Sequence, residues 1–129
     1  MQSLLLVMTG GAIGAGVRHL TGRTLLALLG GSFPYGTLAV NLIGGLLMGL
    51  LAGWLARVGA GGEPARLFLG VGVLGGFTTF SAFSLDTVLM WERGQAMVAL
   101  GYVAVSVVGA IAALAAGLTL ARTTMGAAA

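Results

Sequence analysis

The sequence predicts an all-α membrane protein with four transmembrane helices, the third of them broken. Of its 129 residues, 58% are hydrophobic and 7% are charged, whereas a soluble domain carries roughly 25% charged residues. A helix that crosses a bilayer needs about 20 mostly apolar residues. The charged residues leave four charge-free runs that can supply such helices: residues 1–17, 24–56, 67–85 and 94–121.

The first two helices are separated by a cluster of helix-breaking residues at positions 30–34, with the sequence GGSFP. No basic residue precedes the first apolar run, which favours a retained helix over a cleaved signal peptide. We therefore expect one transmembrane domain over residues 1–129, in a multi-pass protein of the cell inner (plasma) membrane. The predicted helices cover residues 2–21, 35–56, 66–91 and 95–121.

Residues 75–84, with the sequence GGFTTFSAFS, make a poor lipid-facing helix because they combine adjacent glycines with hydroxyl groups. Irregular or polar backbone at membrane depth is tolerated only where protein buries it or a water-filled cavity borders it. A break in the helix also frees carbonyl groups that can coordinate a small cation, and N–H groups that attract anions. We therefore predict that this segment lines a site.

Several polar and aromatic residues could belong to that site. Asn41 is a lone amide deep in the second helix, and it either bonds a neighbouring helix or donates to a permeating species. Phe80 and Phe83 share a helix face, and the positive edges of their rings would favour an anion. Further polar side chains lie one turn before Asn41 and along the fourth helix: Thr37, Tyr102 and Ser106.

Other features restrict the function or leave alternatives open. The chain has no cysteine, and its scattered arginines do not suggest nucleic acid. The apolar runs hold no acidic pair or Cys/His cluster, so we expect no enzyme. Asp86 either has a function within the membrane or reaches the interface. The small residues that follow Asn41 at four-residue intervals indicate close helix packing: Gly45, Gly49 and Gly53.

Loop arginines normally orient a membrane protein, and here each side carries three. Arg57, Arg66 and Arg122 lie on the side of the N-terminus, while Arg18, Arg23 and Arg93 lie on the opposite side. Either another signal sets the orientation, or copies insert both ways and pair antiparallel. Four short helices enclose little interior, so we expect an oligomer in both cases.

Three stretches resemble the CrcB/Fluc family of fluoride ion channels: residues 10–18 (GGAIGAGVR), 36–44 (GTLAVNLIG) and 72–84 (GVLGGFTTFSAFS). The resemblance implies a dual-topology, antiparallel homodimer in the lipid bilayer with two fluoride pathways. It also implies passive export of fluoride from a microbe, and one structural sodium ion bound by backbone carbonyls of Gly75 and Thr78 from both subunits.

The resemblance further implies roles for single residues. Ring edges of Phe80 and Phe83 would coordinate fluoride, Asn41 would donate a hydrogen bond to it, and Arg18 would lie near the aqueous entrance. The remaining pathway residues would be Thr37, Ser84, Tyr102 and Ser106. The chain departs from the family pattern at four positions: His19, Ala82, Asp86 and Ala110.

Two other functions compete with a channel. A small multidrug transporter also has four helices and dual topology, but it needs a carboxylate in its first helix, and residues 1–17 contain none. A non-transporting scaffold subunit would use its polar groups for helix packing only. The phenylalanine pair, Asn41 and the break favour the channel, since packing alone does not require them.

Overall fold

The computed structural model describes residues 1–126, and these are helical with short connections and contain no strand. Three continuous stretches are long and apolar enough to cross a membrane: Gln2–Leu29, Tyr35–Glu92 and Ala96–Thr124. The helical segments are α1 (Gln2–Leu29), α2 (Tyr35–Val58), η1 (Gly59–Gly62), α3 (Glu63–Ala65), the π-helix η2 (Arg66–Leu74), α4 (Gly75–Phe77), α5 (Phe80–Glu92) and α6 (Ala96–Gly126).

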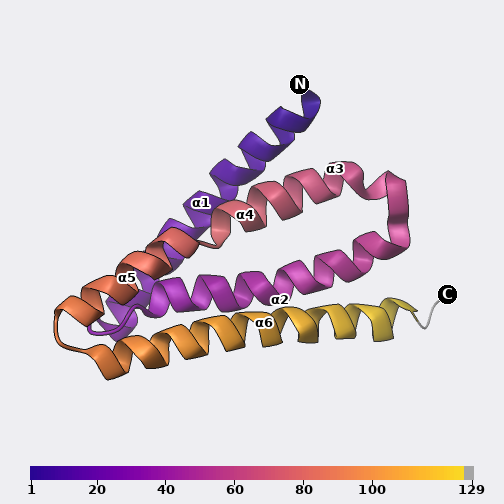
Figure 1. The fold of residues 1–129 in the computed structure, drawn as a ribbon. Coiled ribbons are helices and arrows are strands. Elements are labelled where there is room, and N and C mark those ends of the chain that lie inside the picture. The colour runs from indigo at the N-terminus through magenta and orange to yellow at the C-terminus, as the bar shows by residue number, and fades with distance from the viewer. Residues whose placement is uncertain (127–129) are drawn as a thin grey trace.

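The middle stretch is 58 residues long and doubles back on itself (Figure 1). Its first limb is α2, the turn is η1, and the returning limb runs from α3 through η2 and α4 to α5. Helix α2 lies between α6 on one side and α1 with the returning limb on the other (Figure 1). It is therefore the element against which the rest of the chain is arranged.

Two predicted helix ends were wrong. Helix α1 continues to Leu29, past the predicted end at residue 21, because Arg18 and Arg23 interrupt the apolar run without interrupting the helix. It ends where Gly30 adopts a φ of 83°, a conformation that glycine tolerates and other residues rarely adopt. Helix α6 likewise runs beyond residue 121, as far as Gly126.

The seam between α1 and the returning limb is made by glycines. A side-chain carbon on Gly72 would lie 2.9 Å from the Cα of Gly10, and one on Gly76 would lie 2.6 Å from the carbonyl oxygen of Gly11. The backbone of Gly14 packs on the carbonyl of Val73. These contacts bring the two backbones together with no room for side chains, as expected for helices that associate in lipid.

A second glycine seam joins α2 to α6. A side-chain carbon on Gly45 would lie 2.8 Å from the carbonyl oxygen of Ala110, and Gly49 and Gly117 pack in the same way on Leu114 and Leu46. The prediction that the stripe after Asn41 serves helix packing is confirmed for Gly45, Gly49 and Gly53, all of which contact α6.

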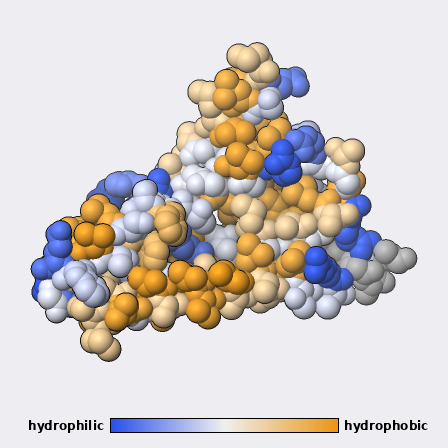
Figure 2. Space-filling view, in the orientation of Figure 1, coloured by the Kyte–Doolittle hydropathy of each residue, from blue (hydrophilic) through white to orange (hydrophobic). Residues whose placement is uncertain are grey.

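Apolar side chains cover much of the outer surface, as a lipid environment requires. Figure 2 shows them over the middle of the molecule, with hydrophilic residues mainly toward its ends. The chain is thus a multi-pass membrane protein, as predicted from its composition.

Candidate functional site

The returning limb leaves the helical conformation at two residues, Thr78 and Thr79, which we call the break. Helix α4 ends at Phe77 and α5 begins at Phe80. Thr78 has φ −83° and ψ 159°, and Thr79 has φ −153° and ψ 122°, so both are extended. The break lies within the segment 75–84 that its composition singled out.

Asn41 of α2 binds the break with both ends of its amide. Its Nδ2 donates to the carbonyl oxygen of Thr79 at 3.0 Å, and its Oδ1 accepts from the N–H of Thr79 at 2.8 Å. The bond to a neighbouring helix, one of the two roles open for Asn41, is therefore present. An amide nitrogen carries two hydrogens, so the second N–H can still serve a ligand.

Arg18 of α1 reaches the other side of the break. Its Nε donates to the carbonyl oxygen of Gly76 at 2.9 Å, across 58 residues of sequence. It also lines a cavity of about 230 Å³ together with His19, Thr37 and Thr79. The resemblance implies that Arg18 lies near the aqueous entrance, and this stays a prediction. The structure shows in addition that Arg18 contacts the backbone next to the break.

Two carbonyl groups at the break lose their helical donors. In a continuous helix Gly75 would accept from the N–H of Thr79, four residues on, but that N–H donates to Asn41. Thr78 would likewise accept from the N–H of Ala82, which instead donates to the hydroxyl of Thr79 at 3.1 Å as the N-cap of α5. The carbonyl oxygens of Gly75 and Thr78 thus lack the donors that a continuous helix would give them.

The break opens onto a cavity of about 410 Å³, which we call the groove. It lies between α2, the break, the start of α5 and the middle of α6. Five residues predicted for the pathway or the cation line it: Asn41, Thr78, Phe80, Phe83 and Ser106. The other lining residues are small or apolar: Gly44, Gly45, Met48, Thr79, Val107, Ala110, Ile111 and Leu114.

Aromatic rings continue from the groove toward the end of the molecule where α5 meets α6. Phe80 and Phe83 have ring centroids 5.5 Å apart, and those of Phe83 and Tyr102 are 5.2 Å apart. Phe33 packs edge-on against Tyr102 at 5.4 Å. Sequence reasoning missed Phe33, which lies in the connection before α2 and gave no sign beyond an aromatic residue beside Pro34.

The two rings predicted to face an anion differ in exposure. Phe83 is buried, with 7% of its surface exposed, whereas Phe80 is 76% exposed. One ring is thus buried within the chain and the other projects from its surface.

Ser106 and Ser84 also differ. The hydroxyl of Ser106 is buried at the groove and has no hydrogen-bond partner within the described part of the chain. Ser84 donates to the carbonyl of Phe80 in its own helix at 2.9 Å and does not line the groove. The structure therefore brings Ser106 to the other predicted residues and leaves Ser84 apart from them.

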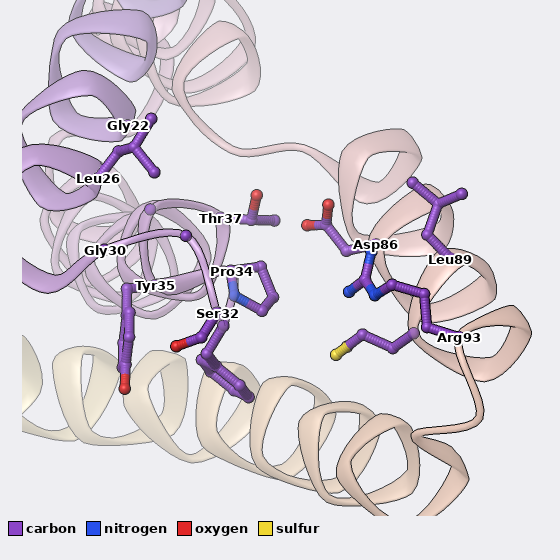
Figure 3. A pocket seen from close by; sticks show the side chains of 14 residues that line it. Gly22, Leu26, Gly30, Ser32, Pro34, Tyr35, Thr37, Asp86, Leu89 and Arg93 are labelled. Carbon is purple, nitrogen blue, oxygen red and sulfur yellow. The ribbon is translucent and has the colours of Figure 1, made fainter.

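A more polar cavity of about 300 Å³ lies at the end of the aromatic series (Figure 3). Asp86 projects into it from α5 and Arg93 from the residue that follows α5, and Thr37 faces them from α2. The hydroxyl of Tyr102 donates to Oδ2 of Asp86 at 3.1 Å, which links this cavity to the aromatic rings. Asp86 and Thr37 thus line this polar cavity, which we call the mouth cavity and which shares no lining residue with the groove.

Among residues 1–126 no three His, Cys, Asp or Glu side chains come together as metal ligands. The fold defines a multi-pass helical membrane protein with a helix break that borders a cavity, the setting in which non-helical backbone is tolerated at membrane depth.

A family profile described as "CrcB-like protein, Camphor Resistance (CrcB)" matches residues 5–118. The chain therefore belongs to the CrcB family. Its relatives are named as ion channels and not as enzymes, in agreement with the prediction that the chain is not an enzyme.

Three similar proteins are named "Fluoride-specific ion channel FluC". The one from Sphingopyxis alaskensis is 59% identical over 122 residues, which cover 95% of this chain and 97% of the relative. The one from Phenylobacterium zucineum is 60% identical over 123 residues, covering 95% and 97%. The one from Mesorhizobium japonicum is 55% identical over 122 residues, covering 95% and 98%.

Proposed function

We propose that this protein is a fluoride-selective channel that exports fluoride passively and so lowers its toxicity in the cytoplasm. The observation that carries the proposal is the groove, which gathers an amide, an unpartnered hydroxyl and two phenylalanine rings at a break in a membrane helix. The names of the relatives supply the identity of the ion.

Selectivity in this proposal comes from replacing the water around the ion. Removing a small, strongly hydrated anion from water is costly unless polar groups compensate for the loss. The second N–H of Asn41, the hydroxyl of Ser106 and the ring edges of Phe80 and Phe83 would compensate in part. None of them carries a full charge, so the ion would be held weakly enough to leave.

We propose that Tyr35–Glu92 crosses the membrane twice, which gives four crossings, and that two protomers pair antiparallel around two pores. The equal division of arginines between the two sides supports dual topology. The exposure of Phe80 supports the pairing of two protomers, because a partner subunit would cover a ring that otherwise projects from the protomer.

A sodium ion between the two breaks would complete the dimer. Carbonyl oxygens at broken helices are suitable ligands for this ion, and the two carbonyls freed at Gly75 and Thr78 would supply four oxygens from two protomers. Gly75 is exposed on the protomer surface, which suits a shared site. The role of the sodium ion would be structural, since the ion would join two negative helix ends.

Two rival functions predict other behaviour. A multidrug transporter couples protons to organic cations, yet the described α1 has no carboxylate. A scaffold subunit would pass no ion, and it leaves the buried, unpartnered hydroxyl of Ser106 without a role.

The test is a current measurement on purified protein in liposomes or planar bilayers, with fluoride or chloride as the only small anion and no ATP. The proposal expects a fluoride current that reverses at the fluoride equilibrium potential, little chloride current, and no dependence on a proton gradient. Folded protein that carries no fluoride current would refute it. A current tied to the proton gradient would favour the transporter.

Topology needs a separate measurement. Tags placed at either terminus should become accessible from both faces of the membrane, because copies insert in both directions. Strictly one-sided labelling would remove the antiparallel dimer and leave the channel itself untouched.

A further inference from the structure

Arg18 lines the cavity of about 230 Å³ beside Thr37, and it also makes a contact that an ion pathway does not require. Its guanidinium does not line the groove, and its Nε donates to a backbone carbonyl at the break, that of Gly76. A bond of 2.9 Å between α1 and a residue 58 positions away needs a structural reason.

The Gly76 carbonyl needs a partner because of where it lies. In a continuous helix it would accept from the N–H of Phe80, which lies beyond the break. The last carbonyls of a helix have no intrahelical donor and carry its negative dipole end. A guanidinium suits both needs, since hydrogen bonds with an ionised donor are roughly twice as strong as neutral ones.

The glycine seam puts Arg18 within reach of this carbonyl. Gly14 packs on the returning limb one turn before Arg18, on the same face of α1, and Gly76 itself lies against Gly11 and Ala15. With the backbones this close, an arginine one turn further along α1 reaches the end of α4. Arg18 and the glycine seam therefore both contact the returning limb near the end of α4.

We propose that Arg18 is a positioning residue that caps the C-terminal end of α4 from the neighbouring helix. Asn41 of α2 binds the N–H and C=O of Thr79 within the break, and Arg18 of α1 binds the carbonyl of Gly76 before it. Between them, these two bonds fix the backbone that presents the Gly75 and Thr78 carbonyls on one side and the Phe80 ring on the other. The effect of this capping on conduction rests on the proposed channel activity, whereas the capping itself does not.

A capping role makes different predictions from an entrance charge. An entrance charge acts over a distance, is screened by salt and is retained by lysine. A cap depends on a donor at the position of Nε, where lysine carries a methylene group and holds its ammonium one atom further out, so lysine can replace arginine only in part. A short bond inside the protein is also screened much less.

The test is hydrogen–deuterium exchange, read by mass spectrometry on peptides that cover residues 77–83, in fluoride-free nanodiscs. It compares the unmodified protein with Arg18→Lys and Arg18→Gln. The matched control is Arg23→Gln, which removes a charge from an exposed position further along α1.

We expect exchange at the break to rise about tenfold in Arg18→Gln, because a hydrogen bond to a charged group is lost. Arg18→Lys should recover only part of the protection, and Arg23→Gln should exchange like the unmodified protein. Exchange in α6 should not change in any variant.

Unchanged exchange at the break in Arg18→Gln would overturn the proposal, and so would full recovery by lysine. Equal acceleration in α6 would also overturn it, since the effect would then not be local. If Arg18→Gln does not fold, Arg18→Lys should still exchange faster at the break than Arg23→Gln. Equal exchange at the break in these two variants would overturn the proposal. No fluoride is present, so an outcome here is independent of whether the protein conducts.

Discussion

Helix α2 contacts its neighbours with two kinds of chemistry. Toward α6 it presents Gly45 and Gly49, whose backbones touch carbonyl groups of α6 directly. Toward the break it presents Asn41, which makes two hydrogen bonds to the backbone of one residue, Thr79. The seam with α6 needs only small residues, so polar groups elsewhere on α2 are not required for packing. The amide of Asn41 is therefore the polar group of α2 that ties this helix to the break, where the proposed pathway lies.

The largest effect is expected from filling the seam. A valine at position 49 would force its side chain into the carbonyl of Leu114, and overpacking of this kind costs about 3 kcal/mol or more when backbone must move. Gly49→Val should unfold at a much lower temperature in detergent, or fail to purify as a single species. Gly101→Val is the control, since nothing lies within 4 Å of that position. Equal melting temperatures would show that the seam is not close-packed.

The next effect is on conduction, at the two rings. Phe83→Ile and Phe80→Ile remove the ring edges, and each should slow fluoride efflux from liposomes by about tenfold or more, equivalent to about 1.4 kcal/mol. Only Phe83→Ile should also lower stability, because Phe83 is buried and Phe80 is 76% exposed. Normal conduction by both variants would exclude the ring-edge role.

Asn41→Ala tests the two hydrogen bonds between α2 and the break. It leaves the N–H and the carbonyl of Thr79 without their partner, which costs about 1–3 kcal/mol for buried groups. Exchange at the break should accelerate and fluoride efflux should fall, while the α2–α6 seam keeps its protection. A variant that conducts normally with an intact break would show that neither hydrogen bond matters.

The smallest effect on stability is expected at Ser106. Its hydroxyl has no partner among the described residues, so Ser106→Ala should leave the melting temperature unchanged. Efflux should still fall a few-fold, on the order of one modest hydrogen bond. Thr87→Val is a matched control, because the Thr87 hydroxyl only donates to the carbonyl of Phe83 in its own helix. A loss of stability without a loss of efflux in Ser106→Ala would assign this hydroxyl to packing.

The membrane class, the packing glycines and the location of the break could be predicted because each depends on local composition. Charge-free runs are sufficient to find membrane helices, but not their ends: Arg18 and Arg23 lie within α1, and Gly30 ends it. The bonds that shape the site join residues 38 and 58 positions apart. Such pairs depend on how the helices pack, so no local pattern reveals them.

The same limit applies to burial. Phe80 and Phe83 are the same residue type and lie three positions apart, yet Phe83 is buried and Phe80 projects outward. Asp86 could be assigned to the mouth cavity only once Tyr102 and Arg93 were seen around it. Which polar residue belongs to which cavity is a property of the assembled fold.

The most direct test of the groove uses the absence of cysteine from the chain. A single thiol introduced as Ser106→Cys would point into the groove, and Gly101→Cys would place one on an open face of the same helix. Both proteins are treated in liposomes with a small membrane-permeant thiol reagent while fluoride efflux is recorded, and mass spectrometry measures the extent of modification.

The account predicts that modification stops efflux through Ser106→Cys and leaves Gly101→Cys unaffected. Complete modification of Ser106→Cys with undiminished fluoride efflux would contradict it, because the ion would then have to cross by another path.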